Sequence, residues 1–246
     1  MHSVMDPAAE AAPPSPGAQA PRTSALRLSL LRLVPALGIG AATFIPAGTL
    51  RWPGGWLGVV LVVGGIIGQD MYVRRRNPGL MERRTRAGAG TPRWDRALMA
   101  YAHLCTIALF LVAGWDGARR YPGFPPPSVW LAGLALWGVG QWLVAWAMGT
   151  NAFFEGTIRL QEDVGHHVID RGPYAILRHP GYAGLIVYYF GIPLLFGSLR
   201  AVIPAALTLL WLLPRTIAED RFLRAKLPGY ADYARRVRAR LVPGVW

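Results

Sequence analysis

The chain has 246 residues, of which 53% are hydrophobic and 16% charged, a balance that is too apolar for an ordinary soluble domain. Its formal net charge of +13 is carried by basic residues that stand in blocks between apolar stretches, which favours the flanks of membrane spans over a nucleic-acid surface. The single cysteine, Cys105, excludes an intrachain disulfide.

The first 24 residues contain five prolines and many alanines, and no run among them can bury a core. We therefore predict a disordered cytoplasmic tail over residues 1–24 and a membrane domain over residues 25–246. A cleaved signal peptide is not expected, because no charged segment directly precedes a short apolar stretch with a small-residue cleavage site.

Six apolar stretches follow, and a helix needs roughly 20 residues to cross the hydrocarbon core. The stretches lie near residues 28–50, 54–73, 97–115, 128–149, 183–197 and 200–214. The last two are short and meet at residues 197–200, where Gly-Ser-Leu-Arg predicts the tight tip of a helical hairpin. The expected fold is an all-α integral membrane protein of about six membrane-crossing helices, with a cytoplasmic C-terminal helix.

The arginines predict the side of the membrane on which each loop lies. Eight of them fall within residues 74–96, between the second and third apolar stretches, whereas the loop between the first and second contains only Arg51. Cytoplasmic loops carry the excess of basic residues, so the long loop is predicted to be cytoplasmic. Alternation then places both termini and the loop over residues 150–182 on that side, and leaves Arg119 and Arg120 outside as a mild exception.

Two polar clusters bracket the predicted terminal hairpin. Arg178-His179-Pro180 precedes it and Glu219-Asp220 follows it. A membrane hairpin returns to the face from which it started, so the two clusters are predicted to form one site. An arginine fork suits a carboxylate or phosphate, a histidine titrates near neutral pH, and the two acids accept hydrogen bonds from a ribose or an amino group. Together they suit a small zwitterionic ligand that contains a nucleoside.

Five motifs follow one another in the C-terminal 100 residues. They are Gly172-Pro173-Tyr174, Arg178-His179-Pro180-x-Tyr182, Arg215-x-x-x-Glu219-Asp220, Pro228-Gly229-Tyr230-x-x-Tyr233 and Arg240-Leu241-Val242-Pro243. Their order and spacing resemble the isoprenylcysteine carboxyl methyltransferase and phospholipid methyltransferase superfamily. Upstream, residues 76–83, Trp94-Asp95 and residues 151–162 resemble its bacterial branch.

The resemblance implies an S-adenosylmethionine-dependent methyltransferase of the bacterial inner membrane. It places the cofactor among the C-terminal helices and cytoplasmic loops, over about residues 150–246, without a Rossmann domain. The glycines of Gly38-x-Gly40 and Gly64-Gly65-x-x-Gly68 agree with this, because they lie inside apolar stretches with no strand before them. They are predicted to be helix-packing positions.

The resemblance also implies which residues form the cofactor pocket. They are Gln161, His166, Gly172, Tyr174, His179, Pro180, Tyr182, Glu219 and Asp220. The superfamily usually has two glutamates where this chain has Glu219 and Asp220, and the shorter reach of Asp220 makes Glu219 the stronger candidate. The predicted catalytic residues are Arg178, His179, Arg215 and Glu219.

A sulfonium methyl group is already activated, so catalysis can rest on positioning, and no metal is expected. A carboxylate acceptor needs no base, only an arginine such as Arg178 or Arg215 to orient it. An amine or a thiol has to lose a proton to His179, Tyr182 or Glu219. The membrane setting predicts a lipophilic acceptor that enters between helices. Carboxyl O-methylation is favoured by the family name, with N- and S-methylation as alternatives.

Two other classes of protein stay open. One is a nicotinamide-dependent membrane reductase of similar helical architecture, and the other is a scaffold or carrier without enzymatic activity, against which the charged clusters count. His166 and His167 are adjacent and do not share a helix face, which argues against a metal pair. Asn151, Glu155 and Arg159 are spaced by four, which predicts one helix face with either a structural Glu155–Arg159 ion pair or a substrate gate.

Overall fold

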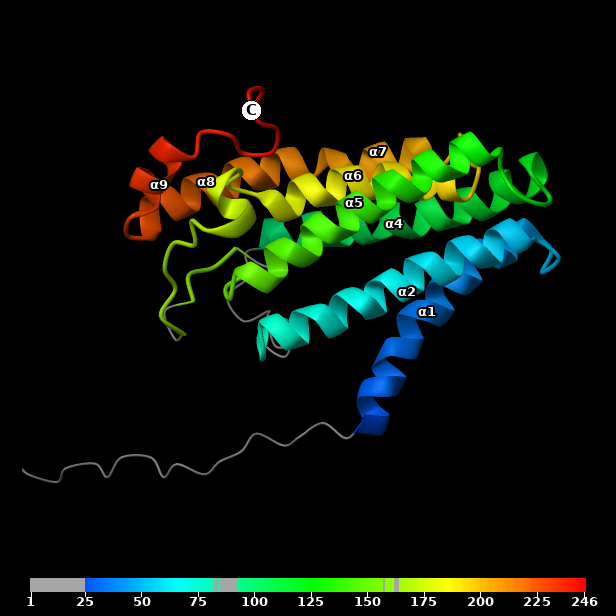
Figure 1. Cartoon of the computed structure of the whole chain (residues 1–246), viewed down its shortest axis with the longest axis horizontal. Helices are drawn as coiled ribbons and strands as arrows, with labels where there is room; N and C mark the ends of the chain where they lie inside the picture. The colour runs from blue at the N-terminus through cyan, green and yellow to red at the C-terminus, as the bar shows by residue number, and fades with distance from the viewer. Residues whose placement is uncertain (1–24, 82–83, 85–92, 157, 162–163) are drawn as a thin grey trace, which may run out of the picture.

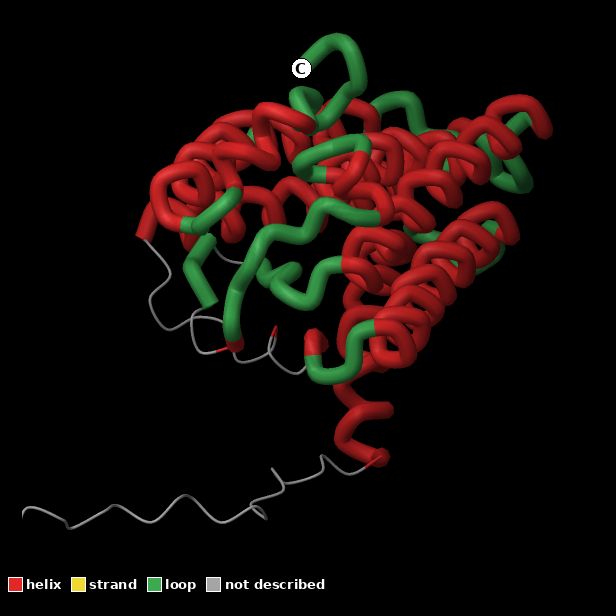
Figure 2. The backbone as a smooth tube through the Cα atoms, turned by 60° about the vertical axis from the view of Figure 1, so that its left-hand side comes forward, coloured by secondary structure: helices red, strands yellow, loops and turns green. Residues whose placement is uncertain are grey.

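The computed structural model describes residues 25–246, apart from residues 82–83, 85–92, 157 and 162–163. The predicted tail over residues 1–24 lies outside this described part. The described residues form helices joined by turns and loops, with no strand among them (Figure 2). The prediction of an all-helical protein is therefore confirmed for these residues.

The helices follow the apolar stretches of the sequence and are labelled in Figure 1. In chain order they are α1 (Ala25–Ala47), α2 (Pro53–Arg76), α4 (Arg93–Arg120), α5 (Pro127–Thr150), the short 3-10 helix η2 (Gly172–Ala175), α6 (Pro180–Leu195), α7 (Val202–Leu210), α8 (Leu212–Lys226) and α9 (Tyr230–Arg236).

Three helices, α2, α5 and α6, begin at a proline, namely Pro53, Pro127 and Pro180. Proline suits the first position of a helix because its fixed φ is helical and the N–H that it lacks has no partner inside the helix. The start of α6 is thus set by the proline of the Arg-His-Pro motif.

Four helical segments of the described chain are long and apolar enough to cross a membrane. They are Pro53–Arg76, Arg93–Arg120, Pro127–Thr150 and Val202–Lys226, and two shorter apolar helices cover Val34–Ala47 and Pro180–Leu195. Large apolar side chains such as those of Val60, Leu104 and Ile203 are exposed on these helices, as expected where lipid replaces water. The chain is an integral membrane protein.

The last apolar stretch is longer than predicted. The helical segment Val202–Lys226 is interrupted at Trp211 and continues through α8, whereas the sequence predicts a span near residues 200–214. The predicted span ends near residue 214 because the hydropathy falls where charged residues begin. The helix goes on because Arg215 and Asp220 of α8 are buried and find partners inside the protein.

The tip between α6 and α7 lies where the sequence predicts it. Gly197 has a φ of +64°, in the left-handed region that glycine adopts without strain. Asp116 of α4 holds the tip, because it accepts hydrogen bonds from the Ser198 hydroxyl (2.9 Å), the Arg200 backbone N–H (3.1 Å) and the Arg200 guanidinium (2.6 Å).

α5 and α6 pack with their backbones close together. A Cβ added at Gly184 of α6 would lie 2.9 Å from the carbonyl oxygen of Gly140 on α5, so both helices need a glycine there. These glycines are not the ones that the sequence singled out. Among the described residues nothing lies within 4 Å of a Cβ added at positions 38, 40, 64 or 68, and only Gly65 of that set meets a neighbour, Trp137. The packing role predicted for the other four is wrong, because those glycines lie on helix faces away from close neighbours.

The polar segments gather at one end of the bundle. Figure 1 shows α8, α9 and the loop that follows α5 at the same end. The end of α2 lies there too, because the amide of Asn77 donates hydrogen bonds to the carbonyl oxygens of Met148 (3.0 Å) and Asn151 (2.9 Å) at the end of α5.

Candidate active site

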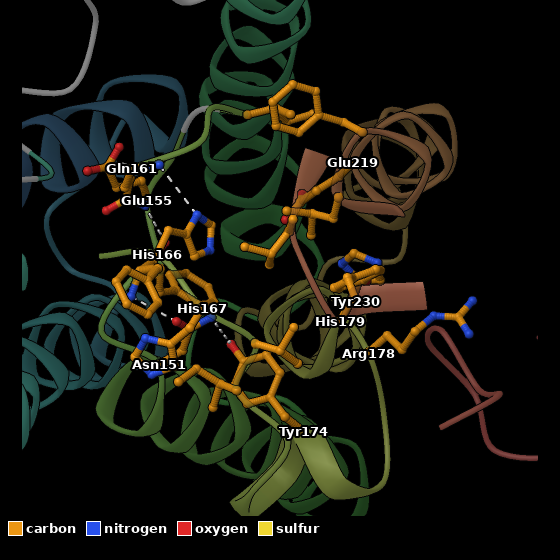
Figure 3. A pocket seen from close by; sticks show the side chains of 18 of the residues that line it. Asn151, Glu155, Gln161, His166, His167, Tyr174, Arg178, His179, Glu219 and Tyr230 are labelled. Carbon is orange, nitrogen blue, oxygen red and sulfur yellow. Dashed lines mark hydrogen bonds between the residues drawn. The ribbon is translucent and has the colours of Figure 1, made fainter. Parts of the chain in front are cut away.

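A cavity lies between the loop after α5, the start of α6, and helices α8 and α9 (Figure 3). It holds about 820 Å³ of empty space, including its mouth. Polar side chains from the loop, α6 and α8 converge on it, among them those of Gln161, His179 and Glu219.

Seven of the predicted site residues line this cavity. They are Gln161, His166, Tyr174, Arg178, His179, Tyr182 and Glu219. The structure thus brings together the two sequence clusters that bracket the terminal hairpin. Four predicted residues do not line the cavity: Gly172, Pro180, Arg215 and Asp220. Gly172 forms the turn into η2 with a φ of +60°, and Pro180 begins α6.

Glu219 is held by Tyr182. The Tyr182 hydroxyl donates a hydrogen bond to Glu219 Oε2 at 2.5 Å and accepts one from Arg215 Nε at 2.8 Å. Arg215 is only 2% exposed and lies behind Tyr182, away from the cavity wall. The predicted catalytic arginine of α8 therefore contacts the site through a tyrosine.

Arg178 is engaged by the C-terminal segment. Its Nη1 donates hydrogen bonds to the carbonyl oxygens of Ala234 (3.2 Å), Val237 (2.9 Å) and Arg238 (3.1 Å), and its Nε lies 2.9 Å from Asp220 Oδ1. Figure 3 shows its side chain directed away from the other labelled residues. Arg178 thus fastens α9 and the segment after it beside the cavity.

Asp220 collects several cationic and hydrogen-bonding partners on the far side of α8 from Glu219. It is 2% exposed, lies within 3.3 Å of guanidinium atoms of Arg178, Arg224 and Arg240, and accepts a hydrogen bond from the Tyr230 hydroxyl at 3.1 Å. Adjacent residues of an α-helix point about 100° apart, so only one of the two acids can face the cavity.

Besides Arg178 Nε, which is ion-paired with Asp220, two buried polar atoms of cavity-lining residues lack a hydrogen-bond partner among the described residues. One is Gln161 Oε1, whose own amide nitrogen donates to the Phe153 carbonyl at 2.8 Å and so fixes the orientation of the side chain. The other is His179 Nε2, which lies 3.8 Å from Asp220 Oδ1, too far for a hydrogen bond. The His179 ring stacks on Tyr182 with centroids 5.6 Å apart. Buried polar atoms are rarely left unpaired. His179 Nε2 is directed toward Asp220, which does not line the cavity.

Burial tunes the titratable groups of the loop side. The pKa of His166 is lowered, first because burial disfavours the charged ring and then because His167 repels the charge. Burial raises the pKa of the Tyr174 phenol, and burial together with the Asp220 charge raises that of Tyr230. The histidine is therefore neutral and the phenols protonated near neutral pH.

Several lining residues are not among the site residues that the sequence predicts. Phe153 stacks on the His166 ring with centroids 4.5 Å apart, and Asn151 donates a hydrogen bond to the Tyr174 hydroxyl at 3.2 Å. Glu155 pairs with Arg159 at 2.8 Å, and the Glu155 side chain is 1% exposed. The four-residue spacing pointed to this pair.

The helix face predicted for residues 151–159 is wrong, because α5 ends at Thr150 and its carboxyl-terminal cap is Asn151. The residues that follow form turns and irregular loop in the part that the structure describes. Asn151 itself accepts a hydrogen bond from the Phe153 N–H at 2.8 Å, which bends the chain into this loop. In the described part of the chain, no group of three or more His, Cys, Asp or Glu side chains is placed to hold a metal ion.

Comparison with known proteins gives a family match in this part of the chain. Residues 129–228 match the family model of phospholipid methyltransferases. The matched segment runs from α5 to the end of α8, and it includes every cavity-lining residue named above except Tyr230 and Tyr233.

Three curated relatives are similar over part of their length. The cobalt-zinc-cadmium resistance protein CzcN of Cupriavidus metallidurans is 36% identical over 133 residues, which are 53% of this chain and 55% of that protein. Two proteins of Oryza sativa, of the subspecies indica and japonica, bear the name probable protein-S-isoprenylcysteine O-methyltransferase. Each is 27% identical over 90 residues, which are 36% of this chain and 47% of the rice protein. The matches thus span about half the length of these relatives. They confirm the resemblance to the isoprenylcysteine carboxyl methyltransferase and phospholipid methyltransferase superfamily.

Proposed function

We propose, from the family match of residues 129–228, that this protein transfers a methyl group from S-adenosylmethionine to a lipophilic acceptor at the cytoplasmic face of a bacterial inner membrane. The observation that carries the proposal is the convergence of Gln161, His179, Tyr182 and Glu219 on one cavity within the matched segment. The domain is taken to span residues 25–246, with the cofactor-binding part over about residues 150–246.

The cavity wall fits the chemistry of such a donor. S-adenosylmethionine supplies an activated methyl group on a sulfonium, together with an adenosine and an amino-acid part. Gln161 Oε1 can accept a hydrogen bond from an amino group, Glu219 and Glu155 offer negative charge, and the rings of Phe153 and Tyr174 offer flat apolar surface.

We assign roles to the other predicted residues from their contacts. His179 and Tyr182 stack beside Glu219 and face the reacting groups, whereas Arg215 supports Tyr182 from behind. Gly172, Pro180 and Asp220 set the backbone and the surroundings of the cavity, and His166 closes its loop side.

Carboxyl O-methylation is our first candidate reaction. An ionised carboxylate needs no base, so positioning alone can bring it into line with the methyl group. The name of the two rice relatives agrees with this reaction.

N-methylation of a lipid amine is the second candidate, and the contacts of two arginines favour it. Arg178 and Arg215 were expected to orient an acidic acceptor, but both guanidinium groups are taken up by partners within the chain. Glu219 has one carboxylate oxygen on Tyr182, and it lies where it can accept a proton from an amine.

Calorimetric titration of the detergent-purified protein with S-adenosylhomocysteine, the demethylated donor, tests the proposal. We expect micromolar binding by the wild type and a loss of roughly tenfold in Gln161→Ala, which removes the unpaired acceptor. Gln141→Ala on α5 is the matched control, because Gln141 is a glutamine outside the cavity, and it should bind as the wild type does. Folded wild-type protein that binds a nicotinamide nucleotide instead would establish the reductase alternative.

A further inference from the structure

Helix α4 carries two buried aspartates at opposite ends. Asp95 in its first turn is 0% exposed and Asp116 near its last turn is 2% exposed. Each pairs with an arginine from the C-terminal hairpin: Asp95 Oδ1 lies 3.0 Å from Arg215 Nη1, and Asp116 Oδ1 lies 2.6 Å from Arg200 Nη1. A buried charge destabilises the fold unless it is paired, so the loss of either arginine contact would be unfavourable.

The Asp116 pair is structural, because Asp116 holds the tip between α6 and α7. The Asp95 pair lies at the cavity end. Asp95 Oδ2 also accepts a hydrogen bond from the backbone N–H of Ile158, a residue that lines the cavity, at 3.3 Å. Asp95 therefore contacts both the loop wall of the cavity and the arginine behind it.

The contacts of Arg215 continue from Asp95 toward the cavity. Its Nη2 donates to the Gly156 carbonyl at 2.5 Å, and its Nε donates to the Tyr182 hydroxyl oxygen at 2.8 Å. Because that oxygen accepts from Arg215, the hydroxyl proton is left to point at Glu219 Oε2, 2.5 Å away. Four groups on α4, α8 and α6 thus form one chain that ends on a cavity carboxylate.

We propose that Asp95 is a positioning residue, which fixes the Glu219 carboxylate for the methyl donor through Arg215 and Tyr182. This inference rests on the proposed function, because Glu219 is taken to face the donor. Asp95 itself does not line the cavity.

Electrostatics explains how the loss of Asp95 would reach Glu219. The buried Arg215 guanidinium has the Asp95 carboxylate 3.0 Å away on one side, and on the other it contacts Tyr182, which holds Glu219. Without the Asp95 charge, Glu219 is the remaining acid, and the guanidinium is drawn toward it past Tyr182. Glu219 then turns from the cavity toward Arg215, and the cavity loses its preorganised acceptor.

A double-mutant cycle on Asp95→Asn and Tyr182→Phe tests the chain of contacts. Calorimetric affinity for S-adenosylhomocysteine is measured for the wild type, the two single variants and the double variant, with melting temperatures recorded for all. We expect each single variant to weaken binding roughly tenfold, and the double variant to bind about as weakly as either single one, because both break one chain. Asp95→Glu, which keeps the charge, should recover part of the affinity, and it replaces Asp95→Asn in the cycle if that variant does not fold.

Asp116→Asn is the matched control, since it removes an equally buried aspartate from the same helix. It should lower the melting temperature and leave the affinity unchanged. Losses that simply multiply in the double variant would overturn the inference, as would an Asp95→Asn variant that is less stable but binds normally. A folded wild type without affinity for the adenosyl ligand would overturn the proposed function and this inference together, which separates the two failures.

Discussion

Arg178 forms multiple hydrogen bonds, as the sequence predicts for an arginine fork, but its partners differ from the predicted ones. Its fork was predicted to orient an acidic ligand, but it binds three backbone carbonyl groups and Asp220 instead. The fork binds the carbonyl groups through Nη1 and Asp220 through Nε and Nη2, whereas the single ammonium of lysine cannot reach both sides at once.

Arg178→Lys should therefore destabilise the protein by about 2 kcal/mol, the size of a hydrogen bond to a charged group, and release the segment after α9. Limited proteolysis should cut the variant near residues 234–240 at protease concentrations that leave the wild type intact. Arg171→Lys, at an exposed position close by in the sequence, is the control and should resist cleavage. Equal resistance of Arg178→Lys would show that the fork is not needed.

His166 gives the cavity a dependence on pH. Its pKa is lowered in the folded state by burial and by His167, below the value of about 6.5 for an exposed histidine. The unfolded chain then binds more protons between these two pKa values, so stability rises with pH across that interval and is lost as the pH falls below about 6.5.

We expect His166→Gln to lose less stability than the wild type when the pH is lowered from 7.5 to 5.5. Melting temperatures in one detergent at the two pH values measure this difference. His103→Gln on α4, outside the cavity, should show the full wild-type drop. A drop in His166→Gln as large as that of the wild type would mean that other groups cause it.

Among the elements, the pair α5 and α6 depends on close contact of its backbones. A side chain at Gly184 has no room, because its Cβ alone would lie 2.9 Å from the Gly140 carbonyl oxygen and 2.8 Å from the Val144 side chain. α6 also begins at the Arg-His-Pro motif, so a shift of this helix moves His179 and Tyr182 as well.

Gly184→Leu should cost about 3 kcal/mol, the upper part of the range for overpacked cores, and reduce the affinity for S-adenosylhomocysteine. Gly138→Leu on α5 is the control, because nothing lies within 4 Å of a Cβ added there, and it should change neither quantity. The fraction of monodisperse protein and the melting temperature report the outcome. Similar losses in both variants would point to a general intolerance of leucine and not to this contact.

The sequence predicted the elements well where a local signal marks them. The apolar stretches near residues 54–73 and 128–149 mark α2 and α5, and the Gly-Ser-Leu-Arg tip marks the turn between α6 and α7. The extent of α8 was missed, since its buried charges look like the end of a span until their partners are known. The loop after α5 was also missed, because four-residue spacing is equally compatible with a helix that does not form.

Membership of the site was predictable in part, because a hairpin must return its two polar ends to one face. The direction of each side chain could not be predicted: Glu219 lines the cavity, whereas its neighbour Asp220 pairs with Arg178. The contact between Asp95 and Arg215 joins residues far apart in the sequence, and it depends on how α4 packs against the last two helices. Such pairs carry no local signal.

The molecule as a whole has two ends that differ in charge. The arginines that follow one another at the end of α2 lie at the cavity end, because Asn77 ties that end to α5, whereas the α6–α7 tip lies at the opposite end. We therefore propose six crossings, made by the four long segments and the two shorter apolar helices, with the cavity on the cytoplasmic side.

Labelling of single cysteines in intact bacterial cells tests this orientation. In a Cys105→Ser background, Ser128→Cys at the start of α5 should react with a membrane-impermeant maleimide, and Ala231→Cys on α9 should react only after the cells are opened. Both positions are exposed, so accessibility within the protein does not limit either reaction. The reverse pattern would invert the proposed topology.

The bonds from Arg178 to the carbonyl groups of residues 234–238 also constrain how the protein is made. Ribosomes deliver α6 to the membrane well before those carbonyl groups leave the exit tunnel. The nascent chain therefore carries an arginine at the start of α6 whose permanent partners have not yet been synthesised. The wall that α9 gives the cavity can therefore form only after residues 234–238 have left the ribosome.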